Sequence, residues 1–497
     1  MTAVTTATGA AEAAVEYRHP ARWAILAVVC LAELTVVLDN TVLNVAVPSL
    51  TRQLHAGTAA VQWMVSAYAL AQSGLLLTAG ALADRWGRRR MLTAGLVVFG
   101  AGSAAAGFAG SAGALIAARV GMGVGGALIL TTTLAVALQV FGERERPAVI
   151  GVWSAVNALG FASGPLIGGA LLQHFRWGAV FLVNLPVVAV ALVAVALLVP
   201  ESRNPVGARP DVPGALLSVT GTTALVFAVV SGPRDGWAAP PVLGAAALAV
   251  AALAVFARWE RRTATPMLDV RFFRDRRFTG AVAGTVLVTF GMGGALFLLT
   301  QDLQFVRGYG PLTAGLRTAP LALTVVALNL TGVCARLIRR VGAPSAIAAG
   351  MTLLAAGVAL VALSGTDGYA LPFAGLVTMG AGCALANPAM AEALMSAIPP
   401  ERAGVGAGIN GTLAELGNGL GVAVLGAVLA SRFTALLPPG PSTSFPAALA
   451  AAHDAPHRAA VTHAFASGIA TSQLIGAVAV FLGGAVAALL LHRADRT

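Results

Sequence analysis

The chain has 497 residues, of which 58% are hydrophobic and only 10% are charged, and its formal net charge is +11. Soluble domains carry about 25% charged residues, so this chain has too few charges to cover a water-facing surface. Its cationic residues lie in short loops between apolar stretches, which indicates membrane topology rather than nucleic-acid binding. The composition predicts an all-α polytopic membrane protein that has the lipid bilayer as a partner and binds no nucleic acid.

Apolar stretches long enough to cross about 30 Å of hydrocarbon recur from one end of the chain to the other. The polar, alanine-rich N-terminus lacks the pattern of a cleaved signal peptide, so we expect the first span, from Trp23, to be retained. The fourteen predicted spans are residues 23–47, 61–82, 91–110, 114–138, 148–171, 177–199, 212–231, 241–258, 279–300, 312–335, 344–364, 371–396, 404–430 and 468–491.

Arginines are distributed very unevenly between alternate loops. One set of loops is rich in them, whereas the opposite set holds a scattered few such as Arg52 and Arg176. The positive-inside rule therefore places both termini in the cytoplasm, which requires an even number of spans. The absence of lysine and the abundance of alanine suggest a bacterium with a GC-rich genome, and hence its inner (plasma) membrane.

Two loop sequences repeat at a distance of eight spans. "GALADRWGRRR" (Gly80 to Arg90) follows the second span, and "GVCARLIRR" (Gly332 to Arg340) follows the tenth. The repeat predicts a six-helix bundle at 1–200, two inserted helices at 201–265 and a second six-helix bundle at 266–497. Parallel repeats of six spans with a substrate path between them are typical of transporters.

The same loop, "GALADRWGRRRML", resembles the signature of the major facilitator superfamily. "LIAARVGMGVGGA" in the fourth span and "GVWSAVNALGFASGPLIGG" in the fifth are similar to its buried-arginine and antiporter motifs. "LDNTVLNVAVP" in the first span is similar to the fourteen-helix drug:proton antiporter branch. The resemblance covers nearly the whole chain and implies two pseudo-symmetric six-helix bundles plus two linker helices.

The loop motif predicts a conformational gate. An acid at a helix end, flanked by arginines, can meet a neighbouring charge or helix terminus in one conformation and release it in another. The predicted gating residues are Gly80, Asp84, Arg85, Gly87 and Arg88.

The glycines of the antiporter motif form a stripe along the fifth span where no side chain projects from the helix. Such a stripe permits close helix packing, and a proline within it favours a kink. Its residues are Gly151, Gly160, Gly164, Pro165, Gly168 and Gly169. The resemblance implies that this seam biases the resting conformation and limits leakage.

Acidic residues inside spans are the strongest functional signal, because a carboxylate at mid-membrane costs about 2.5–3.5 kcal/mol on insertion scales. Glu33 lies near mid-membrane, and Asp39 lies about 9 Å further along the first span, at a depth similar to that of Arg119. Asp39 points about 120° away from Glu33, so we expect it to face Arg119. A carboxylate that loses such a partner binds a proton, so we predict proton coupling by Asp39 and Arg119.

Glu415, in "NGTLAELGNGLG", departs from the uncharged residue that the family more usually has there. It is therefore a candidate for a second titratable group or a cation contact, as is Glu33. The residues predicted to line a substrate cavity are Glu33, Asn40, Asn44, Asn157, Asn410 and Glu415. We also expect Asp302 and Arg317 to pair with each other near the outer face.

Other features predict no further chemistry. The three cysteines lie in apolar spans, where small packing residues are expected rather than disulfides or metal ligands. The segment 431–467, with its three histidines, is expected to be a mobile external loop without a zinc site. A phosphate-cradling glycine-rich loop is not found, so no cofactor is expected and the proton gradient is the predicted energy source.

These observations predict a monomeric, proton-coupled exporter of amphipathic or cationic organic compounds or antibiotics, rather than an enzyme. Two alternatives remain. One is an exporter or uniporter of a specific endogenous metabolite, lipid or amino acid. The other is a membrane sensor that keeps the fold without transporting anything.

Overall fold

The computed structural model of the chain is built of helices. It describes residues 20–54, 56–142, 145–202, 211–263, 266, 270–365, 368–396, 403–437, 444–452 and 454–494. Long apolar segments adopt helices because lipid offers backbone N–H and C=O groups no hydrogen-bond partner outside the helix itself. The second and third helices, Thr58–Trp86 and Arg88–Gly107, are separated by Gly87, whose φ of 110° is a backbone conformation that favours glycine.

The helices follow one another along the chain as α1 (Arg22–Gln53), α2 (Thr58–Trp86), α3 (Arg88–Gly107), α4 (Ala112–Val140), α5 (Arg146–His174), α6 (Ala179–Leu182), α7 (Asn184–Leu198), α8 (Val212–Asp235), α9 (Pro240–Glu260), the 3-10 turn η1 (Val270–Arg274), α10 (Arg276–Gln301), the π-helical turn η2 (Asp302–Val306), α11 (Pro311–Leu330), α12 (Val333–Val341), α13 (Ala343–Ala362), α14 (Ala370–Ser396), α15 (Ala403–Leu436), α16 (Phe445–Ala451) and α17 (Ala455–Ala494).

Within the described ranges, 12 helices are long and apolar enough to cross a membrane. A further span is counted if the two parts of α2, which meet at a bend of 51°, are taken together. Helix α5 covers the predicted span at 148–171, but it is not among the 12 helices counted here. The protein is therefore a multi-pass membrane protein, and the number fourteen stays a prediction.

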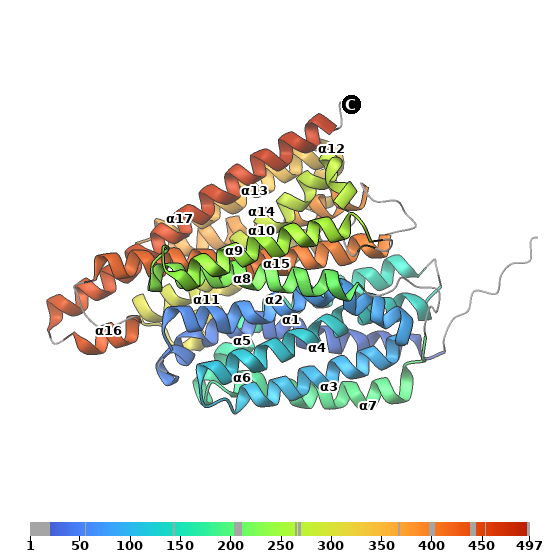
Figure 1. Cartoon of the computed structure of the whole chain (residues 1–497), viewed down its shortest axis with the longest axis horizontal. Helices are drawn as coiled ribbons and strands as arrows, with labels where there is room; N and C mark the ends of the chain where they lie inside the picture. The colour runs from blue at the N-terminus through green and yellow to red at the C-terminus, as the bar shows by residue number, and fades with distance from the viewer. Residues whose placement is uncertain are drawn as a thin grey trace, which may run out of the picture.

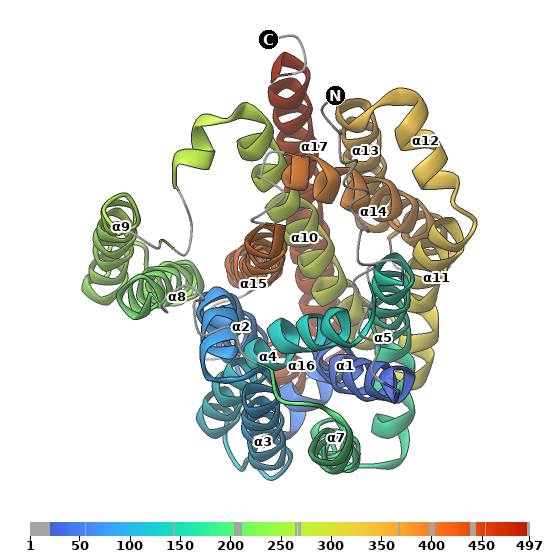
Figure 2. The ribbon, with the colours of Figure 1, turned by 90° about the vertical axis from the view of Figure 1, so that its right-hand side faces the viewer.

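The helices form two bundles that lie against each other (Figures 1 and 2). We call α1–α7 the N-terminal half and α10–α17 the C-terminal half. Within the first half, α4 packs against α2 and α3, and α1 packs against α5. Within the second, α13 packs against α14 and α17, and α10 packs against α15.

The halves share a hydrophobic core at the end of the molecule where α1 finishes. Leu50 of α1 belongs to one core cluster with Phe297 and Leu298 of α10 and Leu429 of α15. Beside them, Gln304 Nε2 donates a hydrogen bond of 2.9 Å to the backbone oxygen of Val45. The two bundles are thus joined at this end by apolar packing and by a buried polar contact.

Two helix pairs form the seam between the halves, α2 with α15 and α5 with α11. Small residues allow the close approach: Ser66 of α2 donates a hydrogen bond of 3.3 Å to the backbone oxygen of Gly419 on α15. A Cβ at Gly169 of α5 would lie 2.7 Å from the Pro311 backbone oxygen and from the Leu312 Cα at the start of α11.

Helices α8 and α9 pack against each other outside the two bundles, at the left of Figure 2. Helix α8 also packs against α2 and α15, so it covers one of the two seams. Asp211 ties the pair together, because its Oδ1 accepts hydrogen bonds from the Gly214 N–H at 2.9 Å and from Trp259 Nε1 at 2.8 Å.

The expectation of a mobile external loop at 431–467 is wrong for the described part of this segment. Helix α15 continues to Leu436, α16 is a short helix, and α17 begins at Ala455 rather than near 468. Phe445 of α16 is buried, with its ring 4.5 Å from the Phe465 ring and 5.3 Å from the Phe305 ring. Aromatic packing, which the proline-rich composition conceals, holds α16 against α17.

We expect Gly169→Ala to destabilise the seam between the halves. The new methyl group would press on backbone atoms that cannot rotate away, and overpacking of this kind costs about 1–3 kcal/mol. The melting temperature of the purified protein in detergent should fall. Gly121→Ala is the control, because a Cβ there meets nothing within 4 Å. Equal melting temperatures for the two variants would contradict a tight seam.

Candidate functional site

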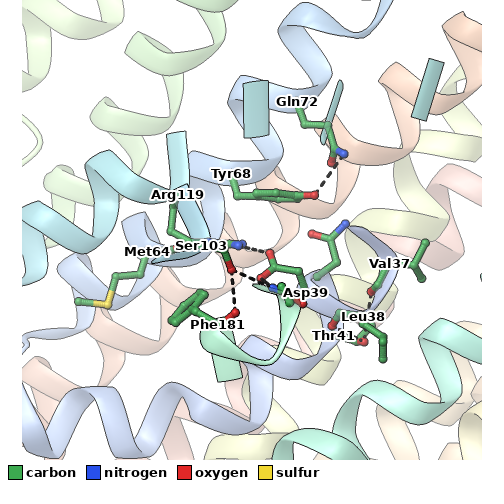
Figure 3. Close-up of polar contacts among 12 residues, drawn as sticks. Val37, Leu38, Asp39, Thr41, Met64, Tyr68, Gln72, Ser103, Arg119 and Phe181 are labelled. Atoms are coloured by element: carbon green, nitrogen blue, oxygen red, sulfur yellow. Dashed lines mark hydrogen bonds and ion pairs between the residues drawn. The ribbon is translucent and has the colours of Figure 1, made fainter. Parts of the chain in front are cut away.

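A buried ion pair joins α1 to α4 in the middle of the N-terminal half. Asp39 is 3% exposed and Arg119 is 1% exposed, and Arg119 Nη1 donates to Asp39 Oδ2. Arg119 Nε also donates to the backbone oxygen of Met64 at 3.1 Å. The guanidinium lies 4.2 Å from the centre of the Tyr68 ring, as Figure 3 shows. The arginine is thereby held by α1 and α2 together.

The other carboxylate oxygen of Asp39 belongs to a chain of polar groups from α3 and α7. Asn184 Nδ2 lies 3.4 Å from Asp39 Oδ1 and 3.1 Å from Ser103 Oγ. Ser103 Oγ in turn donates to the backbone oxygen of Phe181 at 2.7 Å (Figure 3). A buried pair is stable only when its remaining hydrogen-bonding capacity is satisfied, and these neutral groups supply that for the carboxylate.

Glu33 lies two turns before Asn40 on α1 and is completely buried. Its Oε2 accepts a hydrogen bond of 2.8 Å from Thr133 of α4, and Asn157 of α5 is also within interaction range. Its Oε1 has no hydrogen-bond partner among the described residues. Glu33 is therefore held by neutral groups rather than by a cation.

Glu415 connects this region to the C-terminal half. Asn40 Nδ2 lies 3.5 Å from Glu415 Oε1, a contact between residues 375 positions apart in the chain. Glu415 is also within electrostatic range of Glu33 and Arg119. The structure thus brings four of the sequence-predicted charged residues, Glu33, Asp39, Arg119 and Glu415, into one cluster, which extends from the N-terminal half to Glu415 of the C-terminal half.

The remaining cavity candidates are less closely tied to the cluster. Asn157 Nδ2 donates to the backbone oxygen of Trp153 at 3.1 Å, one turn earlier on α5. Asn410 is partly buried on α15, about one turn and a half before Glu415. Asn44 lies on α1, but its side chain is outside the described part of the structure.

The glycines of the antiporter motif position α1. Gly160 packs against Val37, Gly164 against Thr41 and Gly168 against Val42, so the bare stripe of α5 follows the segment that carries Asp39. Pro165 lies within α5, and Gly169 faces α11 instead. The side-chain environment of Gly151 is outside the described part of the structure. The motif therefore bears on α1 and on the seam between the halves.

The gating motif lies where α2 gives way to α3. Arg88 Nη2 donates to Asp84 Oδ1 at 2.8 Å and Nη1 reaches the Ala135 backbone oxygen of α4 at 3.5 Å. Arg85 is exposed, and a Cβ built on Gly80 would lie 3.9 Å from the Thr131 side chain of α4. These contacts lie within the N-terminal half.

The structure adds residues that the sequence did not single out. Glu201, after α7, pairs with Arg90 at 3.5 Å and accepts a hydrogen bond from the Arg89 N–H at 3.2 Å, beside Gly87. Asn184 and Thr133 are contacts of the buried acids. The sequence signal that could have identified Asn184 and Thr133 is an amide or hydroxyl side chain within an otherwise apolar span.

The expected pairing of Asp302 with Arg317 is wrong. Asp302 accepts a hydrogen bond from Arg307 Nε at 2.7 Å, because the π-helical turn η2 places these neighbours together. The Arg317 guanidinium lies 4.0 Å from the Tyr309 ring centre and 4.6 Å from that of Tyr369. Aromatic faces, rather than a carboxylate, surround this cation.

Within the described ranges, no group of three or more histidine, cysteine, aspartate or glutamate residues is placed to hold a metal ion. The three cysteines, Cys30, Cys334 and Cys383, are buried and free.

The family model of the Major Facilitator Superfamily matches residues 29–422. The chain belongs to the Major Facilitator Superfamily. This membership makes it a membrane transporter and explains the two helical bundles with polar residues at their junction.

Curated relatives of this superfamily transporter are efflux and resistance proteins. The multidrug resistance protein Stp of Mycobacterium tuberculosis is 37% identical over 81% of this chain and 75% of that protein. The multidrug efflux pump LfrA of Mycolicibacterium smegmatis is 34% identical over 96% of this chain and 98% of the relative. The tetracenomycin C resistance and export protein of Streptomyces glaucescens is 34% identical, covering 84% and 77%.

Solved structures agree on the fold. A bacterial homologue of the human lysosomal transporter Spinster, in an inward-facing conformation, has a TM-score of 0.67 at 18% identity and covers 96% of this chain and 98% of its own. The POT family transporter PepTSo has a TM-score of 0.68 at 15% identity, and the match covers 95% of this chain and 98% of that chain.

We expect Arg119→Gln to destabilise the protein strongly, since it leaves the buried Asp39 carboxylate without its cation. Breaking a buried pair in this way costs about 3–5 kcal/mol. Adding Asp39→Asn removes the unpaired charge, so the double variant should recover most of the loss in melting temperature. A double variant no more stable than Arg119→Gln alone would show that the pair is not the cause.

Proposed function

We propose that this transporter is a proton-coupled exporter of amphipathic or cationic organic compounds, including antibiotics. The single observation that carries the proposal is the buried Asp39–Arg119 pair in the N-terminal half, with Glu415 of the other half within electrostatic range of Arg119 and of Glu33. The efflux and resistance functions of the relatives support export as the direction and organic molecules as the cargo.

Proton coupling follows from what holds Asp39. Arg119 is its counter-ion, and Asn184 is its neutral partner. Arg119 also contacts the Met64 backbone oxygen and the Tyr68 ring, both on α2, and α2 lies against α15 of the other half. A rearrangement of the α2–α15 seam would therefore shift the arginine relative to the carboxylate. An acid left alone in a low dielectric takes up a proton, so protonation and the seam are linked.

Cargo binding follows from the acids that face the junction. Glu33 and Glu415 come from different halves and are within electrostatic range of each other. A cation bound there would be released when the halves open on the opposite side of the membrane and protons replace it. This is an alternating-access exchange of protons for cargo, with the site between the bundles.

The remaining features of the proposal concern topology and assembly. We propose a bacterial plasma-membrane protein with fourteen spans and both termini in the cytoplasm, as the arginine-rich loops indicate. It would act as a monomer and take its energy from the proton gradient, without a cofactor.

The test is dye uptake into inside-out vesicles whose interior is acidified by the respiratory chain. Wild-type vesicles should accumulate a lipophilic cationic dye, and Asp39→Asn should reduce the initial rate at least tenfold for the same amount of membrane-inserted protein. Glu392→Gln is the matched control, since Glu392 is an exposed acid on α14.

Two outcomes would contradict the proposal. Wild-type uptake that persists when nigericin collapses the pH gradient would rule out proton antiport. Uptake restricted to one endogenous solute, with no response to a panel of dyes and antibiotics, would favour a dedicated metabolite exporter instead.

A further inference from the structure

Helix α12 is a short helix at one end of the C-terminal half, where it packs against α11, α13 and α14 (Figure 2). The span formed by α11 ends at Leu330, and glycines with positive φ stand at both ends of α12, Gly332 at 65° and Gly342 at 81°. At 1.5 Å per residue, the nine residues of α12 extend about 14 Å, less than half the thickness of the hydrocarbon layer. Helix α12 therefore lies beside the ends of the spans and does not cross the bilayer.

The apolar side chains of α12 form two rows, of which only one is covered by protein. Cys334 and Ile338 are 5% and 6% exposed and belong to the core of the C-terminal half. Val333, Leu337 and Val341 recur every four residues and are 43%, 39% and 45% exposed. Residues at this spacing lie on one helix face, so the second row is a continuous apolar strip that points away from the protein.

Three arginines occupy the side of α12 opposite its buried row. Arg336, Arg339 and Arg340 are all exposed, and at 100° per residue they fill the remaining arc of the helix. Arg336 Nη2 donates a hydrogen bond of 2.8 Å to the Thr331 backbone oxygen at the end of α11. Neither Arg339 nor Arg340 forms an ion pair with another described residue. Two cationic groups are thus available to an anion outside the protein.

The matching loop of the N-terminal half balances its charge differently. Aligning the two loop repeats at their first glycines places Arg336 at the position of Asp84, and Arg340 at that of Arg88. In the first copy, Arg88 Nη2 donates to Asp84 Oδ1 at 2.8 Å. The second copy keeps the arginine but has a further arginine in place of the acid. The C-terminal loop therefore carries positive charge that its own residues do not neutralise.

We propose that α12 binds the headgroup of an anionic phospholipid through Arg339 and Arg340, with the strip of Val333, Leu337 and Val341 against its acyl chains. A free phosphate ion would satisfy the arginines but would leave the apolar strip in water, whereas a lipid supplies partners for both. Arginines beside an apolar helix face are the usual means by which a helix lies in the surface of an anionic membrane. The inference is independent of the proposed cargo and of proton coupling.

A lipid held by α12 would also act on the seam between the halves. Helix α12 follows α11 directly, and α11 packs against α5 of the N-terminal half. Anchoring α12 at the membrane surface fixes the adjoining end of α11. The lipid composition of the membrane is thereby connected to one of the two helix pairs that join the bundles.

The experiment measures lipid contact at α12 itself. Leu337→Cys is labelled with bimane in the full-length protein, whose own three cysteines are buried. The labelled protein is placed in phosphatidylcholine nanodiscs with a rising fraction of phosphatidylglycerol that carries a nitroxide on its acyl chain. A parallel series uses phosphatidylcholine with the same nitroxide chain. The lipid fraction that quenches half of the bimane fluorescence is compared between the two lipids.

Half-quenching should require at least tenfold less nitroxide phosphatidylglycerol than nitroxide phosphatidylcholine. In the same background, Arg339→Gln with Arg340→Gln should reduce this preference to less than threefold, because the two cations that hold the phosphate are lost. Arg261→Gln with Arg262→Gln is the matched control, since it removes two exposed arginines at the end of α9. The control pair should leave the preference within twofold of its original value.

Four results would overturn the proposal. Equal quenching by the two lipids would show that α12 touches lipid without selecting an anionic headgroup. Quenching by aqueous iodide but by neither lipid would place the apolar strip in water. A loss of preference in the control pair as large as in the α12 pair would reduce the effect to general surface charge. Loss of the preference when excess inorganic phosphate is added would identify a site for free anions.

A second pair of variants separates loss of the site from loss of the fold. If the glutamine variant has an altered size-exclusion profile, Arg339→Lys with Arg340→Lys replaces it, since lysine keeps both charges. The preference for phosphatidylglycerol should then stay within threefold of that in the unsubstituted background. A tenfold loss in a lysine variant that runs normally on size exclusion would contradict binding by positive charge.

Discussion

The buried ion pair between Asp39 and Arg119 is the interaction on which the arrangement of the N-terminal half depends. Neither charge could stay in this apolar interior alone, because removing an ion from water costs several kcal/mol. The pair and its neutral partners draw together α1, α2, α3, α4 and α7. One electrostatic requirement therefore sets the positions of helices that come from distant parts of the chain.

Close helix packing makes this requirement geometrically possible. The glycines of α5 let α1 approach it along the stretch that contains Asp39, and Gly169 of the same helix meets α11 of the other half. In lipid, hydrophobic burial contributes little to helix association, so close packing at small residues and polar contacts must stabilise it instead. The same helix, α5, thus bears on both the ion pair and the seam between the halves, and this links a buried charge to the relative position of the bundles.

Much of the site could be predicted from local periodicity. Helix rise and rotation placed Asp39 and Arg119 at a common depth, and the two residues do pair in the structure. Contacts that depend on the tertiary fold or on irregular local structure were harder to predict from the sequence. The Asn40 contact with Glu415 joins residues 375 positions apart, and Asp302 pairs with Arg307 because of a π-helical turn that no composition signal announces.

The sequence by itself determined that the chain crosses a membrane many times and that a few charges are retained inside it. Hydropathy and helix period are local properties, and lipid leaves the backbone few alternatives to the helix. Only the tertiary structure decided which buried charges are balanced and which are not. Arg119 can neutralise one carboxylate, and the packing of α1 between α4 and α5 assigns it to Asp39, leaving Glu33 and Glu415 at the junction of the halves.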